Sequence, residues 1–245
     1  MDAERDRFSR VQPHGSGDPC YSVLEPPWRP TLRAAQANLV PGIVIWSVGF
    51  TLVLAYYNIA PVHAALGRLT ELRARTGFLF PAVSTALCGA VLPILYLRSD
   101  PALRADYRFK NCVLLIVFWA YKGVEIELWY RVLAHFVGNN QNVRTVAIKV
   151  FLDQAIYSPF FAVPLTVLVF SFTHVGLRFG PIKADLRAGG WYRRHVLPTV
   201  LANAVIWIPV VCLVYALPLP LQIVLFDLVL CFFILIAAHI TRRRR

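Results

Sequence analysis

Residues 218–240 read PLPLQIVLFDLVLCFFILIAAHI, a stretch in which Asp227 is the only Asp, Glu, Lys or Arg. An α-helix rises about 1.5 Å per residue, so a run of this length crosses the roughly 30 Å hydrocarbon core of a bilayer. Closed β-barrels, the other structures that span membranes, are built from short alternating segments instead of continuous apolar runs. The stretch therefore predicts a transmembrane helix.

Apolar runs of similar length recur along the chain. Hydrophobic residues make up 58% of the sequence and charged residues 16%, and the mean hydropathy is +0.57. This composition predicts an all-α, polytopic transmembrane helical bundle. We place six spans at roughly 39–60, 77–97, 111–136, 146–174, 196–216 and 218–240. Within these spans, we expect helix kinks at Pro159, Pro164 and Pro209.

Polar tails flank the predicted transmembrane domain, which covers residues 38–241. Residues 1–37 carry both charge signs with several Pro and Gly, a composition typical of a flexible tail. Residues 242–245 are four arginines, which we expect to anchor the last helix at anionic lipid headgroups.

Basic residues are distributed unevenly between the two ends of the predicted spans. Of the 25 Lys and Arg, 18 lie in the tails and in the loops after the second and fourth spans, and 3 lie inside spans. The opposite side carries four: Arg68, Arg73, Arg75 and Arg144. Because cytoplasmic loops carry the excess of positive charge, we predict that both termini lie on the cytoplasmic or matrix side.

The net charge of +12 does not indicate a nucleic-acid-binding protein. Most basic residues border the spans, where they set topology, and no nucleic-acid-binding motif accompanies them. The six histidines are dispersed without metal-ligand spacing, and a serine elbow and a phosphate-binding loop are absent. We therefore predict no metal, no cofactor and no enzymatic activity. The expected partners are the lipid bilayer, a small polar solute and a second copy of the chain.

Six charged residues fall inside the third and fourth predicted spans: Lys122, Glu125, Glu127, Arg131, Lys149 and Asp153. Helical spacing predicts three pairs, because residues three or four positions apart are neighbours on a helix surface. The pairs are Lys122 with Glu125, Glu127 with Arg131, and Lys149 with Asp153. The loop between the two spans is short, so we also expect their charges to meet at similar depths.

This balanced set of charges supports two interpretations equally. Ionisable groups at membrane depth are costly and face a bundle interior or a water-filled cavity. The charges either fix helix packing as a self-neutralising network, or they line a hydrated path for a polar solute or ion. An intramembrane enzyme built from distant residues is a third, weaker alternative. Further polar candidates for the same network are Trp129, Tyr130, Gln154, Asn203 and Asp227.

The spacing of these residues resembles a known family, that of Mpv-seventeen and the 22-kDa peroxisomal membrane protein. The resemblance rests on the following residues: Gly123, Trp129-Tyr130-Arg131-Val132-Leu133, Lys149, Asp153-Gln154 and Pro159, and then Trp191, Pro198, Asn203 and Pro209. It covers residues 120–215. The chain departs from the family pattern where the usual Gly-Pro reads Gly123-Val124, where Glu127 replaces a common histidine, and in the span at 39–60, which has no counterpart.

The resemblance implies an integral membrane protein that has been proposed to form a channel. It places such a protein in the mitochondrial inner or peroxisomal membrane of a eukaryote; a bacterial chain would lie in the cytoplasmic membrane. It does not name the transported solute. The sequence hypothesis is therefore a channel-like membrane protein, with a non-conducting structural or assembly protein as the alternative.

Overall fold

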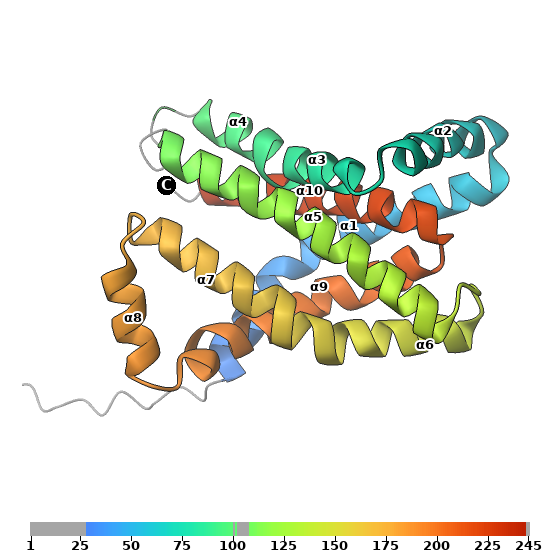
Figure 1. Ribbon diagram of the computed structural model, residues 1–245. Helices are drawn as coiled ribbons and strands as arrows, with labels where there is room; N and C mark the ends of the chain where they lie inside the picture. Colours follow the sequence, from blue (N-terminus) through green and yellow to red (C-terminus); the bar gives the residue numbers. More distant parts are fainter. Residues whose placement is uncertain (1–27, 100, 102–107, 244–245) are drawn as a thin grey trace, which may run out of the picture.

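Each of the six predicted spans is helical in the computed structural model, which describes residues 28–99, 101 and 108–243. The elements, in chain order, are α1 (Trp28–Asn58), α2 (Ala60–Thr76), α3 (Leu79–Ala86), η1 (Leu87–Val91), α4 (Leu92–Arg98), α5 (Phe109–Val137), α6 (Val143–Leu152), η2 (Asp153–Ala162), α7 (Val163–His174), α8 (Phe179–Arg187), η3 (Tyr192–Val196), α9 (Leu197–Tyr215) and α10 (Leu219–Arg243). The three η segments are π-helical. Figure 1 shows their arrangement as a bundle crossed by the diagonal helix α5.

Four helical runs among the described residues are long and apolar enough to cross a membrane. They are Leu79–Arg98, Val143–His174, Tyr192–Tyr215 and Leu219–Ile236. A fifth candidate is the bent pair Gly42–Asn58 and Ala60–Thr76, if the pair counts as one span. Helix α5 has 29 residues, which is long enough, but it carries more charge than these runs. The chain is therefore all-α in its described part, with four or five candidate spans.

The segment between the first two predicted spans is a helix, although the sequence prediction treated it as a loop. Helix α2 follows α1 after the single residue Ile59, and the two axes differ by 100°. Pro61 lies in the first turn of α2, where the missing N–H of proline breaks no intrahelical hydrogen bond. Arg73, counted above as a loop charge, is buried in this helix.

The predicted tails overlap the described helices at both ends. Helix α1 begins at Trp28, so residues 28–37 are helical, while residues 1–27 of the predicted flexible tail lie outside the described residues. Helix α10 extends to Arg243, and residues 244–245 of the basic tail also lie outside.

Each π-helical segment ends two residues before a proline: η1 before Pro93, η2 before Pro164, and η3 before Pro198. A proline removes one N–H donor, and its ring clashes with the carbonyl four residues earlier. A wider π turn changes the hydrogen-bond register and accommodates both effects. Pro159 lies inside η2 and Pro164 follows its end, and α6, η2 and α7 continue as one run through both prolines. Pro209 lies inside α9, which continues through it.

Close helix contacts hold the bundle together at two places. Gly123 of α5 lies against the backbone of Pro81 in α3, so these helices approach without an intervening side chain. On the other side of the bundle, α1 packs along α9. There the indole N–H of Trp46 donates to the Ile206 carbonyl at 3.0 Å. Helix α10 lies between these layers and contacts α1, α4, α5 and α9 (Figure 1).

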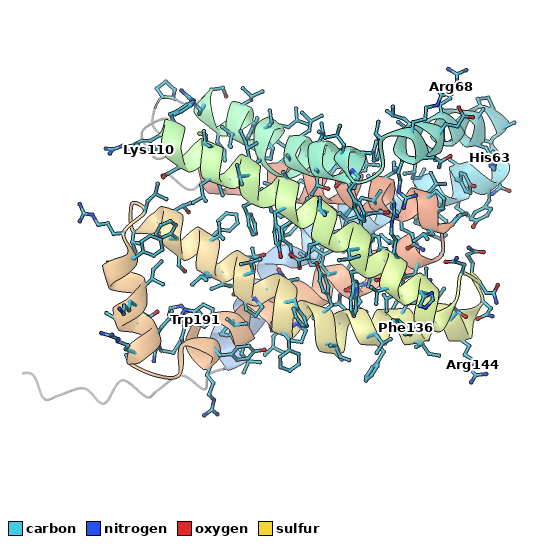
Figure 2. All side chains as sticks on the ribbon, viewed as in Figure 1. His63, Arg68, Lys110, Phe136, Arg144 and Trp191 are labelled. Atoms are coloured by element: carbon cyan, nitrogen blue, oxygen red, sulfur yellow. The ribbon has the colours of Figure 1, made fainter. Side chains whose placement is uncertain are left out.

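The two ends of the bundle carry different sets of connections. Lys110 and Trp191 lie toward the end that contains the start of α5, helix α8 and the end of α10 (Figure 2). His63, Arg68, Phe136 and Arg144 lie toward the opposite end. We call the first the α8 end and the second the α2 end.

Candidate functional site

The first buried cluster joins helix α2 to helix α5 through Glu127. Its carboxylate has 0% exposure and accepts hydrogen bonds from two guanidinium groups. Arg131 Nε donates to Oε1 at 2.7 Å, and Arg73 donates to both oxygens, with Nε at 3.3 Å from Oε2. The predicted Glu127–Arg131 pair is thus present, and Arg73 joins it. The sequence did not predict the role of Arg73, because the residues around it do not distinguish a buried arginine paired with a distant carboxylate from a solvent-exposed loop arginine.

This arrangement corrects the expected pairing between the third and fourth spans. Glu127 takes its second partner from α2, not from α6. The Arg131 guanidinium also lies over the Phe78 ring, at 4.6 Å from its centroid. Charge-assisted hydrogen bonds of this kind satisfy a buried carboxylate.

The second cluster connects α5 to the π-helical segment η2. Lys122 is 3% exposed, and its Nζ donates to Glu125 Oε1 at 2.8 Å, as the spacing predicts. The same Nζ donates to the Tyr157 hydroxyl at 3.2 Å. Tyr157 in turn stacks on Trp129, with ring centroids 5.0 Å apart and planes inclined by 14°. The two aromatic rings and the ammonium group therefore fix η2 against α5.

The third cluster surrounds Asp153 at the start of η2. Tyr215 of α9 donates its hydroxyl to Oδ2 at 2.6 Å, and Gln154 Nε2 lies 3.2 Å from Oδ1. The Tyr215 ring also meets Tyr130 edge to face, with centroids 5.6 Å apart. Tyr215 of α9 thus contacts both Tyr130 of α5 and Asp153 of η2.

The predicted Lys149–Asp153 ion pair is wrong. Among the described residues no carboxylate lies within 4.0 Å of Lys149 Nζ, although Lys149 is only 2% exposed. Its Nζ lies over the Tyr215 ring, 5.8 Å from the centroid. Tyr215 therefore stands between the two charges, offering its ring face to the cation and its hydroxyl to the carboxylate.

Asp227 has hydrogen-bond partners from another predicted span. Ser84 Oγ donates to Oδ2 at 2.5 Å and Thr85 Oγ1 donates to Oδ1 at 2.6 Å. The available signal was the Ser-Thr pair inside the otherwise apolar span at 77–97. Asp227 is not among the residues that line either cavity described below.

A cavity of about 410 Å³ lies inside the bundle, toward the α8 end. Two walls are entirely apolar: η1 and α4 contribute residues such as Ile94 and Leu97, and α10 contributes residues such as Phe226. The polar lining residues come from α5, from the run α6–η2–α7 and from α9. They are Trp119, Lys122, Tyr130, Asp153, Gln154, Tyr157, Ser158, Thr166, Thr199, Asn203 and Trp207.

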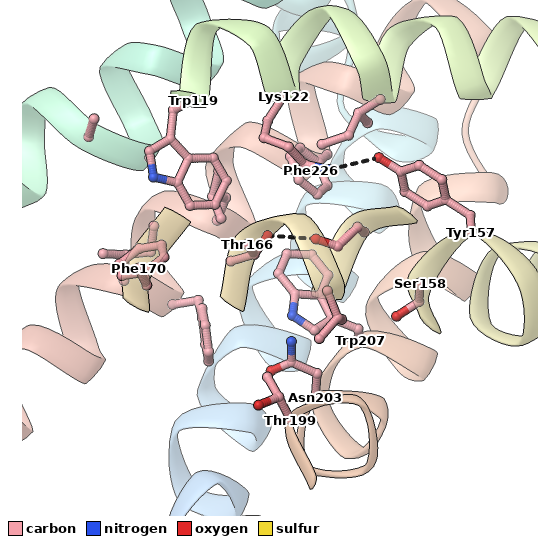
Figure 3. Close-up of a pocket in the computed structure, with 18 of the residues that line it drawn as sticks. Trp119, Lys122, Tyr157, Ser158, Thr166, Phe170, Thr199, Asn203, Trp207 and Phe226 are labelled. Carbon is pink, nitrogen blue, oxygen red and sulfur yellow. Dashed lines mark hydrogen bonds between the residues drawn. The ribbon is translucent and has the colours of Figure 1, made fainter. Parts of the chain in front are cut away.

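Figure 3 shows this cavity from the side, with Trp119 and Lys122 on α5 facing Thr199 and Asn203 on α9. Lys122, Asp153 and Gln154 lie at its inner part, away from the α8 end, and place both signs of charge there. Asn203 also lines the cavity. Figure 3 also shows Ser158 at the cavity wall.

A second cavity, of about 610 Å³, lies between α5 and the run η2–α7. It is lined by Glu125, Trp129 and Tyr157, and otherwise by apolar and aromatic side chains such as Phe161 and Leu165. Tyr157 lines both cavities, and the ion pair of Lys122 and Glu125 has one member in each. This ion pair and the Tyr157 ring therefore form the partition between the two spaces.

Within the described residues, no three His, Cys, Asp or Glu side chains gather as a metal site. Fold and site together define an all-α chain with four or five helices able to span a membrane and with charged side chains buried between them. Comparisons with protein-family models, with curated proteins and with solved structures found no match.

Proposed function

We propose that the chain is a channel-like integral membrane protein that passes a small polar solute or ion, without enzymatic activity. The observation that carries the proposal is the 410 Å³ cavity, whose inner part presents Lys122, Asp153 and Gln154. A buried charge without a functional reason is expected to be fully paired and closed off, as Glu127 is. Lys122 and Asp153 are also buried, but unlike Glu127 they line the cavity.

The cavity fits the larger part of a path across the bundle. Its lining extends along α5 from Leu115 to Tyr130, roughly three-quarters of a bilayer core at about 1.5 Å per residue. Beyond its inner part, Tyr130 and Tyr215 close the way toward the α2 end. A conducting state then requires these two rings to part, and the described conformation is the closed one in this proposal.

We further propose that α5 is a sixth span. Its charges would oppose membrane insertion if they faced lipid. Lys122 and Glu125 satisfy each other, and Glu127 has two arginine partners, so the charges are compatible with a membrane-embedded helix. Six spans place both termini on one side, the cytoplasmic or matrix side by the positive-inside rule. The family resemblance adds the mitochondrial inner or peroxisomal membrane as the proposed location.

Cysteine accessibility tests whether water reaches the cavity. In a variant whose native cysteines are replaced, Ser158→Cys and Asn203→Cys are each exposed to a charged methanethiosulfonate reagent in liposomes. We expect both to react, because both side chains line the cavity. Ile206→Cys, with 0% exposure on the same helix as Asn203, is the matched control and stays unmodified. Equal protection of all three positions would contradict a hydrated path.

Solute efflux tests conduction itself. Liposomes containing the full chain and loaded with a mixture of small ions and neutral solutes should release at least one component faster than empty liposomes. Asp153→Asn should change the rate or the selectivity, because it removes the negative charge at the inner part of the cavity. The channel proposal would be refuted if liposomes containing the chain released no solute faster than empty liposomes and the Asp153→Asn variant gave the same rates as wild type.

The second candidate is a non-conducting structural or assembly protein, and the Glu127 cluster favours it. Arg73, Glu127 and Arg131 line neither cavity, and the pair of Arg73 with Glu127 joins α2 to α5. On this alternative, charge-removing variants in all the buried clusters lower stability and no variant changes solute flux per folded molecule. A flux change caused by Asp153→Asn at unchanged stability would exclude it.

A further inference from the structure

We propose that the 410 Å³ cavity binds a small zwitterion with an apolar body, the chemical class of the apolar α-amino acids. The inference rests on the proposed function in that it names the solute class of the same site. It follows from three properties of the cavity: unused hydrogen-bonding capacity on a cation and an anion, local charge balance, and apolar opposite walls.

Lys122 and Asp153 each retain hydrogen-bonding capacity toward the cavity. An ammonium group has three donors, and Lys122 uses one on Glu125 and one on Tyr157. A carboxylate has about four acceptor sites, and Asp153 uses one with Tyr215 and one with Gln154, while the Trp129 side chain also interacts with it. One donor on the cation and at least one acceptor site on the anion are left. They match a ligand carrying both an anionic group and an ammonium group.

Charge balance favours a ligand without net charge. The charged residues that line the cavity are one cation, Lys122, and one anion, Asp153. This pair is neutral when both groups are ionised. A simple ion would leave an uncompensated charge in a medium of low dielectric constant, which is costly. A zwitterion preserves the balance while engaging both signs of charge.

The remaining walls select an apolar body. The sides formed by η1, α4 and α10 contribute no polar side chain to the lining, and Trp119 and Trp207 add broad aromatic surface. A volume of about 410 Å³ falls in the range of small-molecule sites, roughly 300–1,000 Å³. Asn203 and Ser158 have no side-chain hydrogen bond within the described part of the chain, and their polar groups remain for the ligand. A hydrated inorganic ion would leave the apolar walls unused.

Equilibrium binding to the full chain in lipid nanodiscs tests this assignment, with tritiated L-phenylalanine as the probe. L-Leucine should compete with it. Phenethylamine, which lacks the carboxylate, and 3-phenylpropanoate, which lacks the ammonium group, should each compete at least about tenfold more weakly, as expected for the loss of a hydrogen bond to a charged group. Absence of saturable phenylalanine binding, or equal competition by the two truncated analogues, would overturn the proposal.

Variants locate the site within the chain. Asp153→Asn should lose phenylalanine binding, whereas Glu71→Gln, an exposed acid on α2, should bind like wild type. Ile94→Trp is a second variant that fills the apolar side of the cavity without touching a charge, so it reports on occupancy even if Asp153→Asn fails to fold. Wild-type binding by a folded Ile94→Trp variant would place the phenylalanine elsewhere and overturn the assignment.

A zwitterionic lipid headgroup shares the chemistry of an amino acid, so lysophosphatidylethanolamine is the comparison ligand. Displacement of phenylalanine by this lipid at lower concentration than by L-leucine would overturn the assignment to a free solute. Binding also separates this inference from the proposed function. Saturable phenylalanine binding without solute efflux would refute the channel proposal and support the binding site. Efflux of other solutes without phenylalanine binding would support the channel proposal and refute the binding site.

Discussion

The contact between α3 and α5 gives a prediction that can be worked from the coordinates. A Cβ atom at Gly123 would lie 2.0 Å from the Pro81 carbonyl oxygen and 2.7 Å from both the Pro81 carbonyl carbon and Thr85 Oγ1. Ordinary van der Waals contact begins at 3.4 Å, and the nearest obstacle is backbone. Gly123→Ala therefore forces the two helices apart, because no side-chain rotation relieves the clash.

We expect Gly123→Ala to lower the free energy of unfolding by about 3 kcal/mol, at the upper end of the usual cost of overpacking. Separation of the helices would also strain the hydrogen bond between Thr85 and Asp227, now 2.6 Å long. A bond to a charged group contributes roughly 1.5–3 kcal/mol, which is why we choose the upper end.

Two other glycines supply graded controls. A Cβ at Gly89 would lie 2.6 Å from the indole of Trp119, which is a buried side chain and not backbone, so Gly89→Ala should cost about 2 kcal/mol. Gly67 lies in α2 with nothing within 4 Å of its would-be Cβ, and Gly67→Ala should be neutral or stabilising by roughly 0.5–1 kcal/mol. SDS titration from mixed micelles, followed by far-UV circular dichroism, gives the three values. A Gly123→Ala variant as stable as Gly67→Ala would refute the inferred helix contact.

Three further predictions concern the buried charges. Arg73→Met should lower the free energy of unfolding by about 2–3 kcal/mol, because Glu127 then keeps a single guanidinium partner. The same SDS titration measures this change, and a decrease below about 0.5 kcal/mol would count against the cluster. Tyr215→Phe should cost about 1–3 kcal/mol by removing the hydroxyl donor to Asp153, and an unchanged unfolding curve would contradict that bond. In a double-mutant cycle, Lys149→Met and Asp153→Asn should show a coupling energy below about 1 kcal/mol, because the two charges form no direct ion pair. A larger coupling energy would be evidence for a direct ion pair between them.

Helical spacing predicted contacts inside one helix well and contacts between helices poorly. The pairs of Lys122 with Glu125 and of Glu127 with Arg131 form as expected, because residues three or four positions apart share a helix face regardless of the surrounding fold. Lys149 and Asp153 have the same spacing but do not pair. Tyr215, from a helix 62 positions further along the chain than Asp153, supplies a competing hydroxyl and ring face.

Partners from distant segments left only weak signals in the sequence. Arg73 looked like a loop arginine because the polar stretch that contains it gave no indication of a helix turned by 100°. Ser84 and Thr85 looked like small residues tolerated in a span, and only the placement of α10 beside α3 makes them donors to Asp227. A bond across the bundle depends on helix rotation and depth, which packing decides and local pattern does not encode.

The sequence by itself determined the class of this protein. Apolar runs about as long as a bilayer is thick dictate helices, because a backbone in hydrocarbon must satisfy its own hydrogen bonds. Only the tertiary structure decided which charged side chains are enclosed by ion-pair partners and which line a cavity. Glu127 is enclosed by two arginines while Lys122 and Asp153 line the cavity, although all three are buried charges on adjacent predicted spans. The difference arises because the helices pack closely around Glu127 and leave a cavity beside Lys122 and Asp153.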